Sequence, residues 1–496
     1  MTTNRSLSTT NPSVRQLEPA SLWGHFADLN DVPRPSKKEE RVIAFMRSFG
    51  ESLGLETLVD EVGNVIIRKP ATPGFENQLP IVMQSHLDMV CQKNADTNFD
   101  FDTEGIKMQA DGDWVVAEGT TLGADNGIGV AAIMAVLSSS DVEHPALEGL
   151  FTIDEETGMT GAQGLRGGVL NGRIMLNLDT EDDDELTIGC AGGVNVSAVQ
   201  QYLPEDSPAG THGFKLSVRG LQGGHSGMDI ALGRGNANKI MNRLLWGASS
   251  NFGVSVAEVD GGGLRNAIPR ESFSLLAVNS DQADEFNAWL DSQSEIIQAE
   301  YSVTDPDLKI ILESLTHVPE KVVPEKLQKY LLGCLYGVPN GIYRMSPSIP
   351  GLVQTSNNLA RVLIKDGEIQ INNLTRSSVD SERKDLANAI QALLELTKSQ
   401  IEISGDYPGW QPEPDSTIVA LMSHLYEEMF DEKPNVAACH AGLECGLLGA
   451  NYPDMQLISF GPNIRGAHSP DEKVQISSVQ KFWKFLLETL RRIPAA

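Results

Sequence analysis

The chain has 496 residues, of which 41% are hydrophobic and 21% are charged, a composition typical of folded globular proteins. This length exceeds what one hydrophobic core ordinarily supports, so we expect two or more domains. The 38 basic and 67 acidic residues give a net charge of −29, which would repel phosphate backbones and argues against a nucleic-acid partner. No apolar run approaches the roughly 20 residues that a membrane span needs, so we expect no membrane partner.

The N-terminal segment and the cysteines both indicate a cytoplasmic protein. Residues 1–16 are polar and lack the apolar core of a secretory signal. The five cysteines are scattered and form no Cys-x-x-Cys pair, which argues against a disulfide framework and against a thiolate zinc site. Any bound metal must therefore be held by histidine and carboxylate side chains.

The first part of the chain alternates predicted helices with predicted strands. Residues 18–54 predict two helices, which are interrupted by the prolines at 33–35. The Ala-rich run 128–137 predicts a buried helix. Apolar runs typical of buried strands occupy residues 62–67, 79–83, 150–153 and 174–178. This alternation predicts an α/β domain with a mostly parallel sheet.

The pattern changes after residue 192, where glycine-rich stretches alternate with strand-like runs. Residues 263–278 and 351–374 each predict a strand, a turn and a strand, followed by helices at 281–298 and 380–397. A late strand at 455–460 and an amphipathic helix at 477–492 resemble the first part of the chain again. We expect a catalytic domain formed by 1–192 and 406–496, and an inserted α+β domain at 193–405 with two similar halves.

Histidines and acids follow closely after several of the predicted strands. His86, Glu155, Glu156 and Asp179 all occupy such positions. Ligands of α/β proteins bind outside the carboxyl ends of the strands, so these side chains are expected to converge. Zinc accepts imidazole and carboxylate ligands, and two zinc ions need a bridging carboxylate because the dications repel each other. The candidate metal ligands are His86, Asp125, Glu156, Asp179 and His468.

Each candidate also has an ordinary structural explanation when it is considered alone. Asp125 precedes a predicted helix and would serve as an N-cap. The acids at 154–156 would form a solvated turn, although a tight glycine loop follows them and favours a site. His468 is a lone histidine in a glycine-containing loop, a place where surface histidines are common.

Two further residues are candidates for supporting roles. Asp88 lies two positions after His86 in extended chain, where the two side chains share a face, so Asp88 could orient the imidazole. His225 lies in the Gly-Gly-His-Ser-Gly segment 223–227, where the backbone can approach a ligand closely. His225 could equally be a loop histidine without a function.

Taken together, these motifs resemble those of the dinuclear zinc exopeptidases typified by carboxypeptidase G2, acetylornithine deacetylase and carnosinase. The resemblance covers almost the whole chain beyond the first 15 or so residues. The matching motifs, in order, are His-x-Asp at 86–88, Asp125, Glu-Glu at 155–156, Asp179, Gly-Gly-His-Ser-Gly at 223–227, Gly-Gly-x-x-Asn-x-Ile-Pro at 262–269 and His468. Within this family, segments 32–36, 84–89, 440–446 and 459–462 are similar to those of dipeptidases that cleave aminoacyl-histidine peptides.

The resemblance implies a zinc-exopeptidase-like α/β catalytic domain with a mixed, mostly parallel sheet, interrupted by an inserted α+β lid domain. It also implies two Zn²⁺ ions per chain, for which Co²⁺ or Mn²⁺ can substitute. His86 and Asp179 would hold one zinc. Glu156 and His468 would hold the other, with Asp125 bridging the pair.

The resemblance further implies the roles of the remaining residues. Glu155 would be the general base for the water between the zinc ions, and Asp88 would support His86. His225 would stabilise the oxyanion, whereas Asn266 and Arg376 would bind the substrate's carboxylate. In relatives with a small lid, the histidine that corresponds to His225 comes from a partner subunit. The longer lid of this chain could supply it within one chain, so a homodimer and a monomer both remain alternatives.

The expected substrate is a small peptide, and the expected reaction is metal-dependent hydrolysis of a dipeptide of the carnosine type. A tripeptidase and an N-acyl amino acid deacetylase remain alternatives, because both would use the same metal site. A metal-binding protein without turnover is a third alternative, but it would be expected to lack the base, and Glu155 is present.

Overall fold

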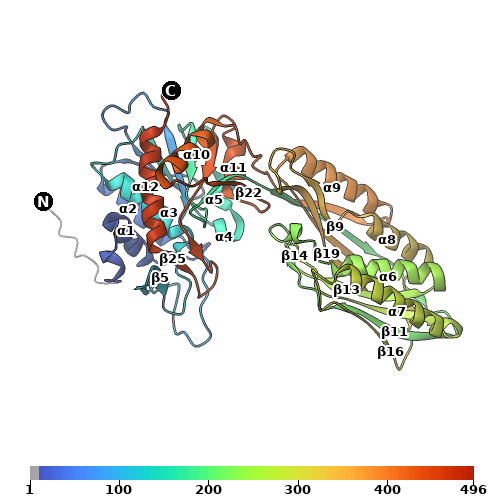
Figure 1. The fold of residues 1–496 in the computed structure, drawn as a ribbon. Helices are drawn as coiled ribbons and strands as arrows, with labels where there is room; N and C mark the ends of the chain where they lie inside the picture. The colour runs from blue at the N-terminus through green and yellow to red at the C-terminus, as the bar shows by residue number, and fades with distance from the viewer. Residues whose placement is uncertain (1–10) are drawn as a thin grey trace. The chain divides into compact units, whose positions relative to one another are not determined.

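The computed structural model describes residues 11–496, which divide into two compact units (Figure 1). Unit 1 comprises the chain up to Gly189 together with Pro412–Ala438 and Glu444–Ala496. Unit 2 comprises Cys190–Gln411 and Cys439–Leu443. The short return of residues 439–443 to unit 2, long after the main insertion has ended, was not predicted from the sequence.

Unit 1 is built on an eight-stranded sheet in the order β1-β2-β6-β3-β7-β23-β8-β22. The four central strands, β6, β3, β7 and β23, run parallel, whereas β1–β2, β2–β6 and β23–β8 are antiparallel pairs. The strands are β1 (Glu56–Val59), β2 (Val65–Lys69), β3 (Ile81–His86), β6 (Leu147–Thr152), β7 (Ile174–Asn177), β8 (Glu185–Cys190), β22 (Asn435–Cys439) and β23 (Gln456–Ser459). The sheet is therefore mixed with a parallel centre, as expected.

The sequences of the central strands are nearly continuous apolar runs, because both faces of the sheet are covered by other parts of unit 1. Every residue of β3, β6 and β7 is buried, the pattern of a sheet packed on two sides. The helices of unit 1 are α1 (Ala20–Asn30), α2 (Glu40–Ser52), α3 (Ala124–Ser138), α4 (Glu155–Gly158), α5 (Thr160–Gly164), α10 (Thr417–Phe430), α11 (Glu444–Asn451) and α12 (Ile476–Arg492), with the 3₁₀ turn η1 (Val14–Gln16). Helix α3 packs against α1, β3 and β6, and α12 packs against α10.

A second, smaller sheet completes unit 1. Its order is β24-β25-β5-β4, and its strands are β4 (Met108–Asp111), β5 (Trp114–Ala117), β24 (Ile464–Arg465) and β25 (Lys473–Gln475). Strands β24 and β25 flank the loop that carries His468, so this sheet fixes both ends of the loop. Within residues 11–496, no helix is long and apolar enough to cross a membrane.

Unit 2 is built on a nine-stranded antiparallel sheet in the order β16-β11-β15-β13-β19-β20-β9-β21, with β18 pairing to β19. The strands are β9 (Gly192–Gln201), β11 (Thr211–Arg219), β13 (Ser255–Gly262), β15 (Ser272–Asn279), β16 (Lys309–Ser314), β18 (Gly341–Met345), β19 (Val353–Lys365), β20 (Glu368–Ser377) and β21 (Gln400–Tyr407). Two short pairs, β10 (Glu205–Asp206) with β17 (Lys321–Val322) and β12 (Gly224–His225) with β14 (Ala267–Ile268), lie outside this sheet.

Helices contribute one side of the hydrophobic core of unit 2. They are α6 (Ala237–Phe252), α7 (Ala283–Glu300), α8 (Glu325–Gly337) and α9 (Asp380–Glu395), with the 3₁₀ turns η2 (Ile230–Leu232) and η3 (Ser280–Gln282). Apolar side chains of these helices, such as Leu244, Phe286, Leu331 and Ile390, pack with the inward-facing residues of the strands. Figure 1 shows the four helices along the sheet of unit 2. The fold expected from the sequence is confirmed: an α/β unit with an inserted antiparallel α+β unit.

Most of the predicted elements are present, but β13 was not predicted. Residues 263–278 contain the short strand β14 and most of β15, in agreement with the predicted strand, turn and strand. Strand β13 precedes them and extends into the glycine-rich stretch, where Gly261 and Gly262 pair with Val362 and Arg361 in β19. A Cβ on Gly262 would lie 1.9 Å from the carbonyl oxygen of Ala360, so close approach of two strands explains this glycine.

We predict opposite effects on stability for two helical glycines of unit 1. A Cβ on Gly129 in α3 would lie 2.5 Å from Ser85 Oγ and 2.8 Å from the carbonyl oxygen of Leu178, whereas a Cβ on Gly24 in α1 would meet nothing within 4 Å. Gly129→Ala should therefore destabilise the fold by about 1–3 kcal/mol through overpacking. Gly24→Ala should stabilise it by about 0.5–1 kcal/mol, because alanine favours the helix.

The two variants serve as controls for each other in urea unfolding followed by circular dichroism. Equal midpoints for both variants would contradict this account of the packing around α3.

Candidate metal centre

The carboxyl ends of the parallel strands bring the predicted metal ligands together. His86 is the last residue of β3, and Glu155 and Glu156 begin α4, just after β6. Asp179 follows the end of β7, and His468 lies between β24 and β25. Because β6, β3 and β7 are adjacent and parallel, their carboxyl ends lie at one edge of the sheet.

Three overlapping groups of side chains at this edge could hold a metal ion, with potential ligand atoms within 4.8 Å of one another. The groups are His86 with Asp125 and Asp179, His86 with Glu155 and Glu156, and Asp125 with Glu156 and His468. All five predicted ligands and Glu155 thus lie in one cluster.

Asp125 occupies the middle of the cluster. Its Oδ1 lies 3.2 Å from His86 Nε2, and its Oδ2 lies 3.2 Å from His468 Nε2. His86 Nε2 is also 3.5 Å from Asp179 Oδ1, and His468 Nε2 is 3.1 Å from Glu156 Oε2. Each oxygen of Asp125 therefore faces a different imidazole and carboxylate pair, which is the arrangement that a bridging ligand requires.

The chemistry of the cluster fits cations. His86 Nδ1 lies 3.2 Å from the carbonyl oxygen of Asp88 and 3.4 Å from its Oδ1, so a neutral His86 carries its proton on Nδ1. The lone pair on Nε2 then faces the oxygens of Asp125 and Asp179, a repulsive contact unless a cation lies between them. Glu156 Oε1 is buried without a hydrogen-bond partner, so it has unused capacity as a ligand.

The pKa values of the clustered side chains also indicate an excess of negative charge. Burial disfavours the charged form of His86, but the acids around it, Asp179 first, raise its pKa well above the ordinary value. Hydrogen bonds to Asp125 and Glu156 raise the pKa of His468 to about 11. Burial would raise the pKa of Asp125, but the two histidines lower it well below its usual range. In the protein alone, protons on the histidines supply the missing positive charge.

Three other acids in and around the cluster have raised pKa values, so they bind a proton more readily than Asp125 does. Burial, reinforced by Asp179, Glu444 and Glu156, raises the pKa of Glu155 well above its ordinary value. Burial raises the pKa of Asp179 to about 6 and that of Glu181 to about 8. A bound divalent cation would reverse these shifts, because it stabilises the charged forms.

Asp88 connects the histidine to the pair of glutamates. Its carboxylate accepts hydrogen bonds from the main-chain N–H groups of Glu155 (3.0 Å) and Glu156 (3.2 Å), and from Ser36 Oγ (2.7 Å). Burial opposes its charged form, but His86 and these hydrogen bonds lower the pKa of Asp88 to about 2. Asp88 thus orients both an imidazole and the turn that carries two acids.

Glu472 is a supporting residue that the sequence did not indicate. It is 3% exposed, and its two oxygens accept hydrogen bonds from the main-chain N–H groups of four consecutive residues, 122 to 125, at 2.7–3.2 Å. One carboxylate therefore fixes the segment that ends in Asp125. The only hint in the sequence is an acid four positions after His468, which is too common a spacing to single out.

Arg34 also contacts this segment. Its guanidinium donates to the carbonyl oxygens of Gly123 (2.5 Å), Leu87 (3.0 Å) and Asp88 (3.0 Å). Arg34 is 1% exposed, and burial lowers its pKa even though Glu472 opposes the shift. Its side chain thereby joins the loop before α3 to the segment after β3.

A second unpredicted carboxylate, Glu444, lies beneath the cluster. Its Oε2 accepts hydrogen bonds from Gln84 Nε2 and Thr152 Oγ1, both at 2.7 Å. Burial raises the pKa of Glu444 to about 7, and Asp179 contributes to the increase. Gln84 also accepts a hydrogen bond from Asn177, so a polar network crosses the central strands directly below the metal-ligand candidates.

The three predicted substrate-binding residues belong to unit 2. His225 in β12 and Arg376 in β20 are neighbours, with His225 Nε2 3.5 Å from a guanidinium nitrogen. Asn266 lies in the exposed turn before β14, and its carbonyl oxygen accepts a hydrogen bond from the N–H of Ser226 (2.7 Å). The structure therefore brings His225 and Arg376 into contact, while Asn266 is tied to the same segment through its backbone.

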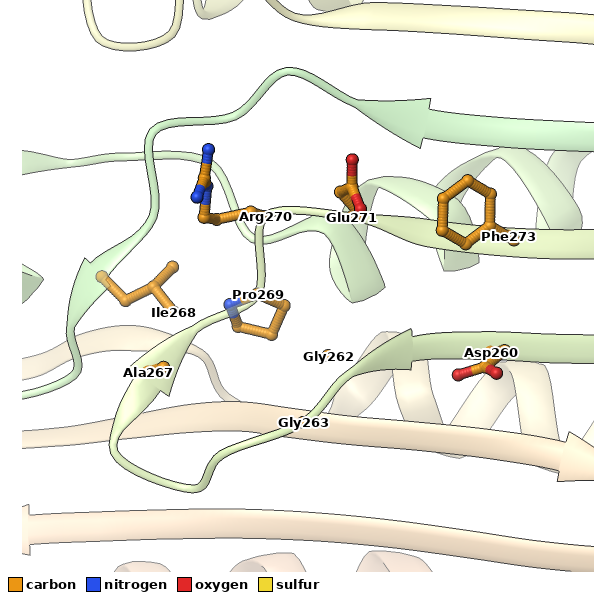
Figure 2. Close-up of a pocket in the computed structure, with 9 residues that line it drawn as sticks. All are labelled: Asp260, Gly262, Gly263, Ala267, Ile268, Pro269, Arg270, Glu271 and Phe273. Atoms are coloured by element: carbon orange, nitrogen blue, oxygen red, sulfur yellow. The ribbon is translucent and has the colours of Figure 1, made fainter. Parts of the chain in front are cut away.

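A surface pocket of about 440 Å³ lies beside the predicted Gly-Gly-x-x-Asn-x-Ile-Pro segment (Figure 2). Figure 2 shows the side chains of Ile268, Arg270, Glu271 and Phe273 around it, with Asp260 on the neighbouring strand. His225, Asn266 and Arg376 do not line this pocket. The candidate substrate-binding groups and this pocket are therefore separate features of unit 2.

The cluster in unit 1 has the ligand types and spacing of a site for paired metal ions, on a fold that carries an inserted antiparallel unit. The model of the peptidase family M20/M25/M40 matches residues 82–492, and the chain belongs to this family. The matched range includes all five predicted metal ligands and Glu155.

Known proteins are similar to this chain over nearly its whole length. The cytosol non-specific dipeptidase of Escherichia coli (strain K12) is 42% identical over 482 residues, which cover 97% of this chain and 99% of the relative. The crystal structure of aminoacylhistidine dipeptidase from Vibrio alginolyticus superimposes with a TM-score of 0.93 at 42% identity, covering 97% of this chain and 98% of that one. Aminopeptidase PepT from Bacillus cereus shares the fold, with a TM-score of 0.57 at 14% identity and coverage of 96% and 99%.

We predict that Glu472→Gln weakens metal binding by about 10–100-fold, the usual cost of losing a group that orients a ligand. The amide keeps one acceptor oxygen but presents N–H groups to two of the four main-chain donors, which are then left unpaired inside the protein. Titration calorimetry with Zn²⁺ on the metal-free protein measures the change.

Asp471→Asn is the matched control, because the exposed Asp471 is the neighbour of Glu472 and loses the same charge. Equal zinc affinities for the two variants would show that the four hydrogen bonds to Glu472 do not position Asp125.

Proposed function

We propose that this protein hydrolyses dipeptides of the Xaa-His (carnosine) type in a metal-dependent reaction in the cytoplasm. The observation that carries the proposal is Asp125, whose two oxygens face two separate imidazole and carboxylate pairs in the same cluster as Glu155. The substrate class is supported by the 42% identity to the cytosol non-specific dipeptidase and to aminoacylhistidine dipeptidase.

The proposed centre holds two zinc ions, for which Co²⁺ or Mn²⁺ can substitute, since histidine and carboxylate ligands accept all three. His86 and Asp179 are the proposed ligands of one ion. Glu156 and His468 would hold the other, and Asp125 would be a ligand shared by both. When bound, the two ions supply an activated water and polarise the peptide carbonyl.

Glu155 is the proposed general base. It takes a proton from the attacking water and then delivers that proton to the leaving amine. Asp88 holds the N–H groups of Glu155 and Glu156, which keeps the base in a fixed position relative to His86. In the protein alone, burial and the neighbouring acids Asp179, Glu444 and Glu156 favour a proton on Glu155.

His225, Asn266 and Arg376 are the proposed substrate-binding groups. His225 would donate to an oxygen that gains negative charge during the reaction. Arg376 and Asn266 would bind the substrate's terminal carboxylate, for which a guanidinium is the best-suited side chain. The roles are distinct from metal binding, so variants at these positions should retain their metal.

The tripeptidase and the deacetylase are less well supported than the dipeptidase. The chain is 42% identical to two dipeptidases over nearly its whole length, whereas its likeness to PepT is limited to the fold. A protein that only binds metal is also less well supported, because Glu155, the proposed base, is present in the cluster.

We predict that Glu155→Gln lowers kcat by at least about 100-fold, since general-base catalysis contributes on the order of 10²–10⁴. The amide cannot take a proton, but the ligand atoms of the metal centre are unchanged. Zinc content measured by mass spectrometry should therefore stay near that of the unaltered protein.

Glu51→Gln, an exposed glutamate on α2, is the matched control and should keep full activity. Near-normal turnover in Glu155→Gln would refute the proposed base.

We predict that a chelator abolishes dipeptide hydrolysis and that zinc, cobalt or manganese restores it. The restored protein should cleave β-alanyl-histidine in preference to a tripeptide and to acetylornithine. Rates for the three substrates, measured side by side, check both statements.

Undiminished activity after complete metal removal would contradict the mechanism. Cleavage of acetylornithine without cleavage of any dipeptide would instead favour the deacetylase.

A further inference from the structure

Glu444, the buried carboxylate beneath the metal-ligand candidates, forms no ion pair with a cationic side chain of residues 11–496. It is 1% exposed. Its Oε2 accepts hydrogen bonds from the neutral side chains of Gln84 and Thr152, both at 2.7 Å, whereas its Oε1 has no hydrogen-bond partner in the described part of the chain. Burial of an ionised carboxylate costs free energy unless it is paired, so the compensating charge must come from elsewhere.

The other fully buried glutamates of unit 1 show what is missing at Glu444. Both oxygens of Glu148 accept hydrogen bonds, from Arg68 and from two main-chain N–H groups among others. Both oxygens of Glu472 accept from main-chain N–H groups. Among the described residues, the one other buried carboxylate oxygen without a partner is Oε1 of Glu156, a proposed metal ligand. The incompletely paired carboxylates are therefore both at the metal centre.

The register of the central strands fixes Glu444 next to the proposed ligands. Gln84 lies two positions before His86 on β3, so the two side chains point to the same face of the sheet. Thr152 on β6 is the register partner of His86. A carboxylate that binds both Gln84 and Thr152 is thus held just below His86. Glu444 belongs to none of the groups of potential ligands, so it acts from outside the ligand set.

The charges of the metal centre act on Glu444 even though they do not contact it. Burial raises the pKa of Glu444 to about 7, the positive charge of His86 opposes this shift, and Asp179 and Asp88 reinforce it. In the protein alone, the proton on His86 thus stabilises the charged form of Glu444. A divalent ion bound at His86 would place a larger positive charge at the same point, in an interior that screens charges weakly.

We propose that Glu444 is a positioning residue of the metal centre: held by Gln84 and Thr152, it supplies a buried negative charge that strengthens metal binding without being a ligand. This inference rests on the proposed two-metal centre and adds a residue to its support. The effect is reciprocal, because ions that stabilise the charge of Glu444 must be bound more tightly when that charge is present.

The test compares the metal affinity and the stability of Glu444→Gln, which removes the charge but keeps an acceptor oxygen. Zinc affinity of the full-length chain, measured by competition with a chelator at about pH 8, should fall about tenfold. At this pH, above the raised pKa of Glu444, the metal-free chain carries the cost of an unpaired buried charge, and the variant does not. The midpoint of urea unfolding without metal should therefore not fall.

Two further variants separate charge from structure. Glu148→Gln is the matched control, because Glu148 is a buried glutamate of β6 that pairs with Arg68. It should lower the urea midpoint of the metal-free chain and leave the zinc affinity unchanged. Glu444→Asp keeps the charge and shortens the side chain, so its zinc affinity should stay within about threefold of that of the unaltered chain.

Three outcomes would overturn the role of Glu444. The first is equal zinc affinity in Glu444→Gln and the unaltered chain. The second is a weakened affinity accompanied by a lower urea midpoint, or by failure of the metal-free variant to fold, because either would indicate a purely structural role. The third is an equal loss of affinity in Glu444→Gln and Glu444→Asp, which would assign the effect to the hydrogen bonds rather than to the charge.

A failure of the proposed function would be recognised separately. If the unaltered chain binds zinc but cleaves no dipeptide, the function fails, and the tenfold difference in zinc affinity would still support the role of Glu444. If the unaltered chain cleaves dipeptides and Glu444→Gln binds zinc equally well, the function stands and this inference fails. Absence of zinc binding by the unaltered chain would overturn both.

Discussion

The excess of buried negative charge around Asp125 is the constraint on which the rest of unit 1 depends. Asp125, Glu156 and Asp179 crowd against only two imidazoles, and burial raises the pKa of the nearby Glu155. Like charges at such distances are stable only if protons or metal ions compensate them. The protein alone uses protons on the two histidines, and the family to which the chain belongs supports replacement of those protons by metal ions. The parallel strands bring these groups to one edge of the sheet, and the charge balance explains why that edge suits cations.

The protein organises this charge by using further carboxylates as acceptors for main-chain N–H groups. Asp88 binds two N–H groups of the turn at 155–156, and Glu472 binds four N–H groups of the segment that ends in Asp125. Hydrogen bonds to ionised acceptors are stronger than those between neutral groups, so each short loop is held firmly.

The sequence was sufficient to locate the ligand candidates because their signals are local. His86, Glu155 and Asp179 follow apolar strands, and the position of a strand end can be recognised from neighbouring residues. The supporting residues could not be found in this way, since Glu472 contacts Leu122 across 350 positions and Glu444 contacts Gln84 across 360. Strand β13 was missed for a similar reason: only β19, about 100 residues later in the chain, shows that the glycines at 261–262 belong to a strand.

The hydrogen bonds between Glu472 and the segment before α3 have a consequence for the order of events during synthesis. Strands β3, β6 and β7 can pair as soon as they leave the ribosome, yet the loop at 122–125 then lacks the acceptor that gives it its shape. His468 and Glu472 arrive together, after unit 2 has been translated in full. The loop at 122–125, which carries one of the acids of the centre, therefore reaches its final shape only when Glu472 emerges, close to the end of translation.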